Sequence, residues 1–322
     1  MQTVQLPHTD LTVSRACFGA MTFGGQTDEP TARRMVDLCL DRGINFFDTA
    51  NSYNKGQSET ILGNVLKGRR DRVILASKVG TPTGFPADAS ALSKKSVLAN
   101  IDATLQRLST DYLDLYYMHM PDYKAPIEET LEAFDEVIRA GKVRYPGTSN
   151  FAAWQVLEAI DISEKNGYRA PYTSQPMLNL LARGIEQEYV PFCRKYRVST
   201  IVYNPLAGGL LTGKQHRDRP IAGTRFDNNQ MYLDRFWHPA YFDAVDEVRR
   251  VAEKAGRSMI DLSFNWILHH TPTDVVLLGA SKMEQLEGNL EVFGRGPLDA
   301  DTVAALDQVW QNLRGVTPKY NR

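Results

Sequence analysis

The chain has 322 residues, of which 43% are hydrophobic and 23% charged, so it is long enough and apolar enough for one globular domain spanning residues 1–322. Its 37 basic and 38 acidic residues are mixed along the sequence and give a formal net charge of −1, which argues against nucleic acid or a membrane surface as a partner. Three widely spaced cysteines, without a CxxC pair and without a signal peptide before them, argue against disulfides and structural zinc and favour a cytoplasmic location.

Apolar runs of strand length alternate with amphipathic segments of helix length almost to the end of the chain. Beyond a short β-like pair, eight strands are expected, at residues 16–18, 45–48, 73–78, 113–119, 143–149, 173–177, 199–203 and 275–279. Between the strands, Asp28 is expected to cap one helix and Ser93 another. Eight β–α units without a linker of different composition predict an α/β fold, a closed (β/α)8 TIM barrel.

Two features depart from a regular barrel. The connection between the seventh and eighth strands holds a long loop at 204–238 and two extra helices, expected at 241–255 and 258–269. Because long loops in compact domains usually have a function, we expect this loop to cover a ligand. Pro146 lies inside the fifth strand, where its missing N–H predicts a local bulge.

Three expected strands end in groups capable of acid–base chemistry. Asp48, Lys78 and His119 stand at these ends, and Tyr53 follows Asp48 closely. Each residue alone is better explained as an ion-pair member or a core histidine, but parallel strands would gather all of them at one edge of the sheet. There, Lys78 is expected to lower the pKa of Tyr53, and His119 to donate to a carbonyl oxygen. This set predicts reduction of a C=O group by a nearby hydride source.

A second group of strand ends suggests where a hydride donor would bind. Ser149, Asn150 and Gln175 offer hydroxyl and amide groups suited to a carboxamide, and Tyr203 offers a ring that can stack on a flat heterocycle. No GxGxxG motif follows the first strand, so a Rossmann cofactor site is not expected. No metal site is expected either, because the adjacent histidines at 269–270 lack partner ligands.

The segment Gly208–Lys214 matches the GxxxxGK pattern of NTPase phosphate loops. Gln215 stands where an NTPase needs a Ser or Thr for Mg²⁺, so an NTPase is a weak alternative. The glycines can still let the backbone approach a pyrophosphate, with Lys214 countering its charge.

Along essentially its whole length, the sequence resembles the aldo-keto reductase family, and most of all its aflatoxin-aldehyde and succinic-semialdehyde reductase branch. The matching segments are FDTA at 47–50 with Tyr53, GQSETILG at 56–63, SNFAAW at 149–154, YNPLAGGLLTGK at 203–214 and YNR at 320–322.

This resemblance implies NADPH-dependent reduction of aldehydes, or of ketones and dicarbonyls, to alcohols. It implies a catalytic tetrad of Asp48, Tyr53, Lys78 and His119, with Tyr53 as proton donor. The implied cofactor-binding residues are Ser149, Asn150, Gln175, Tyr203, Asn204, Pro205, Leu206, Gly208, Gly209, Leu210, Lys214, Arg225, Ser281, Lys282, Gln285 and Asn289. The implied substrate-binding residues are Met21, Tyr232, Arg235 and Arg322.

In the semialdehyde-reducing branch, residues matching Arg235 and Arg322 help to hold the substrate carboxylate. The resemblance also allows a homodimer. One alternative function remains within the family, a redox-sensing NADP(H)-binding regulatory subunit with negligible turnover, as in members associated with potassium channels. Steady-state turnover distinguishes it from a reductase.

Overall fold

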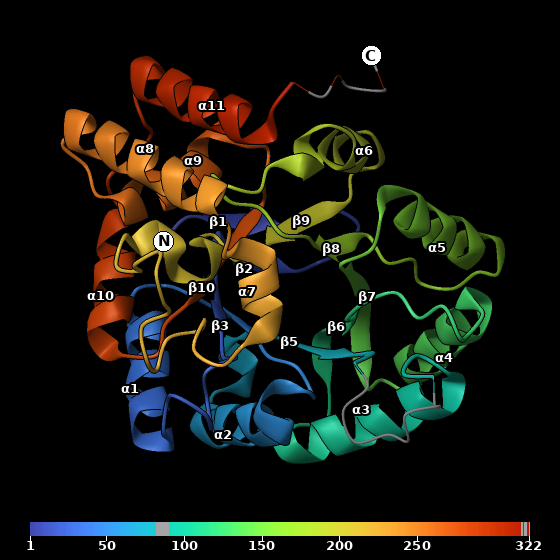
Figure 1. Cartoon of the computed structure of the whole chain (residues 1–322). Coiled ribbons are helices and arrows are strands. Elements are labelled where there is room, and N and C mark those ends of the chain that lie inside the picture. The colour runs from blue at the N-terminus through green and yellow to red at the C-terminus, as the bar shows by residue number, and fades with distance from the viewer. Residues whose placement is uncertain (82–89, 317, 319–320, 322) are drawn as a thin grey trace.

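The computed structural model describes residues 1–81, 90–316, 318 and 321. Eight parallel strands close into a barrel inside a ring of helices (Figure 1), in the neighbour order β10-β3-β4-β5-β6-β7-β8-β9. The strands are β3 (Ala16–Gly19), β4 (Phe46–Asp48), β5 (Ile74–Val79), β6 (Leu113–Met118), β7 (Val143–Ser149), β8 (Thr173–Gln175), β9 (Ser199–Val202) and β10 (Val275–Gly279). The TIM barrel and its eight expected strands are confirmed.

All of the described helices except α7 cover the outside of the barrel. The helices are α1 (Glu29–Asp41), α2 (Gln57–Leu66), α3 (Lys94–Leu108), α4 (Ile127–Arg139), α5 (Ala153–Lys165), α6 (Tyr189–Tyr196), α7 (Gln230–Phe236), α8 (Pro239–Ala255), α9 (Met259–His270), α10 (Met283–Val292) and α11 (Ala300–Arg314). Both expected caps are confirmed, since the Asp28 side chain accepts from Thr31 N and the Ser93 side chain from Ser96 N.

The alternation of side chains along each strand produces two apolar layers. Phe46 points into the barrel, where it packs with Cys17 and Leu115, whereas Phe47 belongs to the layer between strands and helices. A hairpin of β1 (Thr3–Gln5) and β2 (Thr12–Ser14) closes the amino end of the barrel, because its flanking leucines pack into the inner layer. The amino end is thus filled with apolar side chains.

The two irregularities differ from expectation in detail. Strand β7 keeps one register against β6 through Pro146, with Tyr116 opposite Pro146 and Tyr117 opposite Gly147, so the expected bulge is wrong. On its other side β7 pairs with β8 only from Thr148 onward, so at Pro146 that ladder has not yet begun.

The segment at 204–238 is not a plain loop. It contains the turn η4 (Ala207–Thr212) and the helix α7, which lies over one end of the barrel in Figure 1. The two extra helices expected after it are α8 and α9. Within the described residues, no helix is long and apolar enough to cross a membrane, and no cluster of three or more His, Cys, Asp or Glu could hold a metal ion.

Candidate active site

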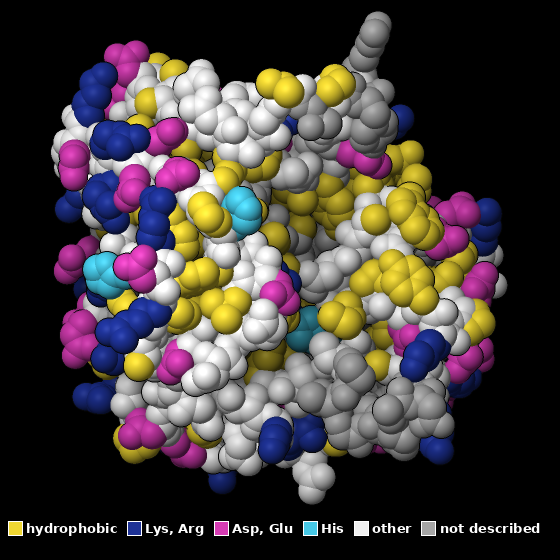
Figure 2. All heavy atoms as spheres, viewed as in Figure 1, with side chains coloured by type: hydrophobic (Ala, Val, Ile, Leu, Met, Phe, Trp, Pro, Cys, Tyr) yellow, Lys and Arg dark blue, Asp and Glu magenta, His cyan; other side chains and the backbone are white. Residues whose placement is uncertain are grey.

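Four polar side chains from the sequence pattern meet at the carboxyl end of the barrel. Asp48 ends β4, Lys78 lies near the end of β5, and His119 directly follows β6, while Tyr53 begins the short turn η1 (Tyr53–Gly56). Neighbouring parallel strands present these groups at one edge. Figure 2 shows this face hollowed at its centre, with hydrophobic side chains gathered on both sides of the hollow.

The Lys78 side chain is fully buried, and its ammonium group has three acceptors. Nζ donates to Asp48 Oδ1, to the backbone oxygen of Thr49 at 2.9 Å and to the Tyr53 hydroxyl at 3.5 Å. Burial by itself would lower the pKa of Lys78, but the charge and hydrogen bonds of Asp48 and Tyr53 outweigh it and raise that pKa. The amine therefore stays protonated at neutral pH, with all three N–H groups hydrogen-bonded.

The turn that carries Tyr53 has an unusual backbone. Asn54 and Lys55 have φ of 49° and 56°, a left-handed conformation that residues with side chains rarely adopt. The Asn54 side chain secures the turn, because Nδ2 donates to the backbone oxygens of Met21 at 2.9 Å and Phe23 at 2.8 Å. Strained geometry of this kind persists only where surrounding contacts hold it.

The rings of Tyr53 and His119 meet edge to face, with centroids 5.8 Å apart and planes at 81°. Burial raises the pKa of Tyr53, and the opposing charge of Lys78 offsets only part of the shift, so the expected lowering of this pKa is wrong for this structure. Burial, with the charge of Lys78, lowers the pKa of His119 to about 3. At neutral pH the pair is a protonated phenol beside a neutral imidazole.

A second polar set lies at the ends of β7, β8 and β9. Ser149 Oγ donates to the backbone oxygen of Gln175 at 3.0 Å, and Asn150 Nδ2 donates to the backbone oxygen of His119 at 2.8 Å. The Tyr203 hydroxyl donates to Asn150 Oδ1 at 2.7 Å. These contacts connect the expected carboxamide-binding groups to the strand end that carries His119, so both sets belong to one site.

The glycine-rich segment forms η4 rather than an NTPase phosphate loop, because no helix begins at Lys214. Asn204 Oδ1 accepts from Gly208 N at 2.7 Å and holds the turn. Gly208 and Gly209 have φ of 70° and 109°, and a Cβ at Gly209 would meet no atom within 4 Å. Open space therefore lies beside the backbone at Gly209, and Lys214 is exposed. The other residues expected to contact the pyrophosphate lie in the same segment, Pro205, Leu206 and Leu210.

Most of the residues expected around the adenosine end lie on α10 or just before it. Gln285 Oε1 accepts from Ser281 N at 2.9 Å and from Ser281 Oγ at 3.1 Å. Asn289 Nδ2 donates to the backbone oxygen of Gly279 at 3.4 Å, and Lys282 is exposed just before the helix. Ser281, Lys282 and Gln285 thus stand at the start of α10, and the Asn289 side chain reaches from within the helix to the last residue of β10.

The expected substrate side is built around Tyr232 on α7. Two guanidinium groups stand over its ring, Arg225 at 5.4 Å and Arg235 at 5.7 Å from the centroid. Arg225, expected at the adenosine end, also donates to the Tyr232 hydroxyl at 3.4 Å. Met21 is partly buried in the loop after β3, and Arg322 lies outside the described residues.

Residues 15–311 match the model of the family described as Aldo/keto reductase family. The chain belongs to this family.

Two curated relatives of this aldo-keto reductase span nearly the same length. Human aflatoxin B1 aldehyde reductase member 2 is 36% identical and covers 94% of this chain and 88% of its own. An uncharacterized oxidoreductase of Bacillus subtilis (strain 168) is 34% identical and covers 99% of each chain. The solved structure of a glycerol dehydrogenase from Gluconobacter oxydans has a TM-score of 0.82 at 29% identity, over 99% of both chains. This aldo-keto reductase is therefore an oxidoreductase.

One contact in this aldo-keto reductase has no counterpart in the sequence pattern. Gln175 Nε2 donates to Asp48 Oδ2 at 2.9 Å, although the two residues are 127 positions apart. Residue spacing gives no signal for this contact, because it crosses the interior of the closed barrel.

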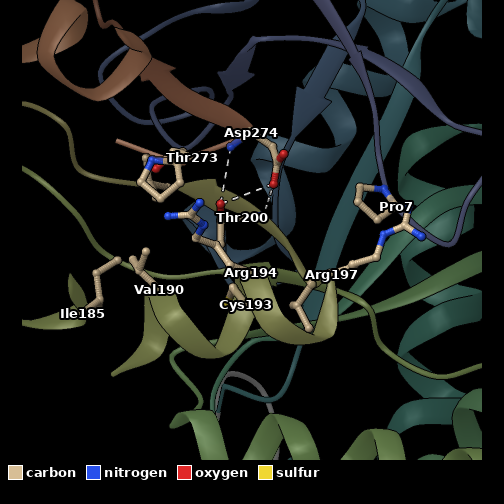
Figure 3. A pocket seen from close by; sticks show the side chains of 12 residues that line it. Pro7, Ile185, Val190, Cys193, Arg194, Arg197, Thr200, Thr273 and Asp274 are labelled. Carbon is tan, nitrogen blue, oxygen red and sulfur yellow. Dashed lines mark hydrogen bonds between the residues drawn. The ribbon is translucent and has the colours of Figure 1, made fainter. Parts of the chain in front are cut away.

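A cavity of about 150 Å³ lies apart from this site (Figure 3). Its lining comes from Pro7, Ile185, α6, β9 and the residues just before β10, and includes Cys193 and Asp274. Asp274 Oδ2 accepts from Thr200 N at 2.7 Å, which ties β10 to β9. The residues that line the cavity include none of the expected site residues.

Proposed function

We propose that this aldo-keto reductase reduces aldehydes to alcohols, with hydride from NADPH and a proton from Tyr53. The observation that carries the proposal is the contact of the Tyr53 hydroxyl with the buried, protonated Lys78, 3.5 Å away, beside a neutral His119. A neutral imidazole can donate a hydrogen bond to a carbonyl oxygen without competing as the acid. The names of the human aldehyde reductase and the bacterial glycerol dehydrogenase agree with chemistry at a C–O bond.

The side chains divide the reaction between them. His119 would orient the carbonyl oxygen, and Tyr53 would give its hydroxyl proton to that oxygen. A nicotinamide cofactor, when bound, would supply the hydride for the carbonyl carbon. Lys78 stabilises the resulting phenolate, and Asp48 keeps Lys78 charged and in place. Water then returns a proton to Tyr53. A raised pKa keeps the phenol protonated at neutral pH, as reduction requires.

The chemistry of the second polar set fits a nicotinamide cofactor. Ser149, Asn150 and Gln175 offer amide and hydroxyl groups for a carboxamide, and Tyr203 offers a partly buried ring for stacking. The open backbone at Gly209 suits a pyrophosphate.

We expect NADPH to be preferred over NADH through Arg225 and Lys282. A guanidinium and an ammonium make charge-assisted bonds to a 2′-phosphate that a hydroxyl cannot replace. The double variant Arg225→Ala/Lys282→Ala should lose most of this preference in Kd measurements with both cofactors. Equal wild-type affinities for the two cofactors would refute the assignment. If Lys282→Ala alone abolishes the preference for NADPH, Arg225 does not bind the 2′-phosphate. Its role is then the contact with the Tyr232 hydroxyl.

For the substrate, we expect short aldehydes that carry a carboxylate to be favoured. Arg235 stands over Tyr232 at the carboxyl end of the barrel, and a guanidinium binds a carboxylate with two hydrogen bonds. The test compares KM for succinic semialdehyde and butanal in the wild type, in Arg235→Met and in a chain truncated after Asn321. Equal wild-type values would rule out a carboxylate pocket and leave bulkier neutral carbonyls or dicarbonyls as substrates.

The central test is Tyr53→Phe, assayed by NADPH oxidation across a panel of aldehydes. Turnover should fall about 10²- to 10⁴-fold, the usual contribution of a general acid, while NADPH still binds. Wild-type turnover in the variant would refute Tyr53 as the acid. Tight NADPH binding with no turnover by the wild type on any aldehyde would favour the regulatory-subunit alternative.

A further inference from the structure

Gln175 and Asp48 come from opposite sides of the barrel. β8, which ends in Gln175, and β4, which ends in Asp48, are separated in the ring by β5, β6 and β7 one way and by β9, β10 and β3 the other. Both side chains are buried, with 3% and 1% of their residue surface exposed. Their hydrogen bond of 2.9 Å therefore spans the mouth of the barrel inside the protein.

The chemistry of this contact fixes the orientation of the Gln175 amide. An ionised carboxylate only accepts hydrogen bonds, so the amide nitrogen has to face Asp48. The carbonyl Oε1 is then the group left for another partner. The backbone of Gln175 is held as well, because its carbonyl accepts from Ser149 Oγ at 3.0 Å.

From Asp48 the contacts continue to the proton donor. Asp48 Oδ1 accepts from Lys78, and Lys78 Nζ is 3.5 Å from the Tyr53 hydroxyl. Gln175, Asp48, Lys78 and Tyr53 thus form one chain of hydrogen bonds, and three of its members are almost completely buried. A buried chain transmits a change at one end because its groups have no solvent to replace a lost partner.

We propose that Gln175 is a positioning residue that couples cofactor binding to the acid, with its nitrogen holding Asp48 and its carbonyl accepting from the carboxamide N–H of the nicotinamide. The proposal rests on the proposed function and adds a role for Gln175 toward Asp48. Because coupling is reciprocal, removing either contact changes the other.

The first experiment measures binding rather than turnover. Wild type should bind the 3-acetylpyridine analogue of NADP⁺, which lacks the amide N–H, about 3- to 10-fold more weakly than NADP⁺, the range for loss of one neutral hydrogen bond. The thionicotinamide analogue keeps the N–H and should bind like NADP⁺. In Gln175→Met the discrimination should disappear. Gln285→Met, at the adenosine end, is the matched control and should weaken all three ligands alike.

The second experiment uses Gln175→Glu, which has the same shape. At low pH its protonated carboxyl group can donate to Asp48 as the amide does, whereas at higher pH two carboxylates face each other. Two quantities are compared with wild type at each pH: kcat, and the urea midpoint of the cofactor-free protein. In the variant, both should nearly equal the wild-type values at low pH and fall below them as pH rises. At pH 8, kcat should be lower than that of wild type by more than about 10-fold. Ser149→Ala should lower cofactor affinity without this pH dependence.

Retained discrimination in Gln175→Met, or a pH-independent Gln175→Glu, would overturn the coupling. The measurements of cofactor-analogue binding and of urea unfolding need no turnover. They therefore decide this inference even if no aldehyde proves to be a substrate.

Discussion

Two buried aspartates, Asp48 and Asp114, lie at opposite ends of the barrel and are each 1% exposed. Asp48 ends β4 at the carboxyl end, whereas Asp114 is the second residue of β6 at the amino end. Asp114 accepts from Arg70 at 2.8 Å, from Arg144 at 2.7 Å and from the backbone N of Leu75 at 2.9 Å.

The partners of the two carboxylates explain their different uses. Arginine stays charged at any accessible pH, so the contacts of Asp114 can fix strands β5, β6 and β7 but cannot move a proton. Asp48 contacts a lysine that also touches the Tyr53 hydroxyl. A buried ion pair therefore indicates chemistry only where its partner contacts a titratable group near a substrate.

The sharpest way to test this contrast is Lys78→Met. We expect kcat to fall about 10²- to 10⁴-fold, because Tyr53 loses the charge that stabilises its phenolate. Asp48 would also keep a buried charge without its cation, at a cost of roughly 3–5 kcal/mol in unfolding free energy. Lys94→Met is the control. Lys94 pairs with Glu132 and Glu136 at the surface, so both quantities should hardly change. Normal kcat in Lys78→Met would remove the distinction between the two ends.

At the amino end, Asp114→Asn should affect stability alone. Its two arginines lose their shared carboxylate charge, and we expect a loss of roughly 3 kcal/mol in urea unfolding. The kcat of the folded variant should equal that of wild type, because Asp114 does not contact the reacting groups. A reduced kcat at unchanged stability would show that the amino end also serves the reaction.

The two ends of the barrel should also differ in how much stability they lose at low pH, and at the carboxyl end this loss depends on His119. Its pKa of about 3 in the folded protein lies below the value of about 6.5 expected when unfolded, so only the unfolded chain binds this proton between those values. The associated stability is present above pH 6.5 and falls by roughly 2 kcal/mol between pH 6.5 and 5. In His119→Gln this part of the loss should be absent.

His270 provides the matched control at the amino end. Burial also lowers its pKa, but the negative charge of Asp307 opposes this shift, and no such charge acts on His119. We therefore expect His270→Gln to reduce the acid sensitivity less than His119→Gln does. Identical urea midpoints for wild type and His119→Gln at every pH would contradict burial of a neutral imidazole.

The smallest effect should come from the left-handed backbone positions. Lys55→Gly and Arg197→Gly should each stabilise the protein by about 0.5–1 kcal/mol, because glycine adopts a positive φ without a clash. Arg197 ends α6 away from the site, so its variant should keep wild-type kcat. Lys55→Gly should lower kcat, because the turn that carries Tyr53 becomes looser. Equal kcat in both would mean that the strained turn does not position Tyr53.

The sequence predicts the barrel well because alternating strands and helices leave few other folds, and it predicts the meeting of Asp48, Lys78 and His119 because parallel strands end at one edge. It does not predict the Gln175 contact, which depends on which strands face each other across the closed ring. It also misses α7, because Gly, Asp and Asn around that helix indicate a loop. The direction of the Tyr53 pKa shift depends on burial, which no motif reports.

The three hydrogen bonds of Lys78 also bear on how the protein survives its proposed substrates. An unprotonated lysine attacks aldehydes through its nitrogen lone pair and forms a Schiff base. The ammonium of Lys78 has no lone pair, and Asp48, Thr49 and Tyr53 occupy its three N–H groups. The residue that tunes the acid is therefore protected from covalent capture by the aldehyde that the acid protonates.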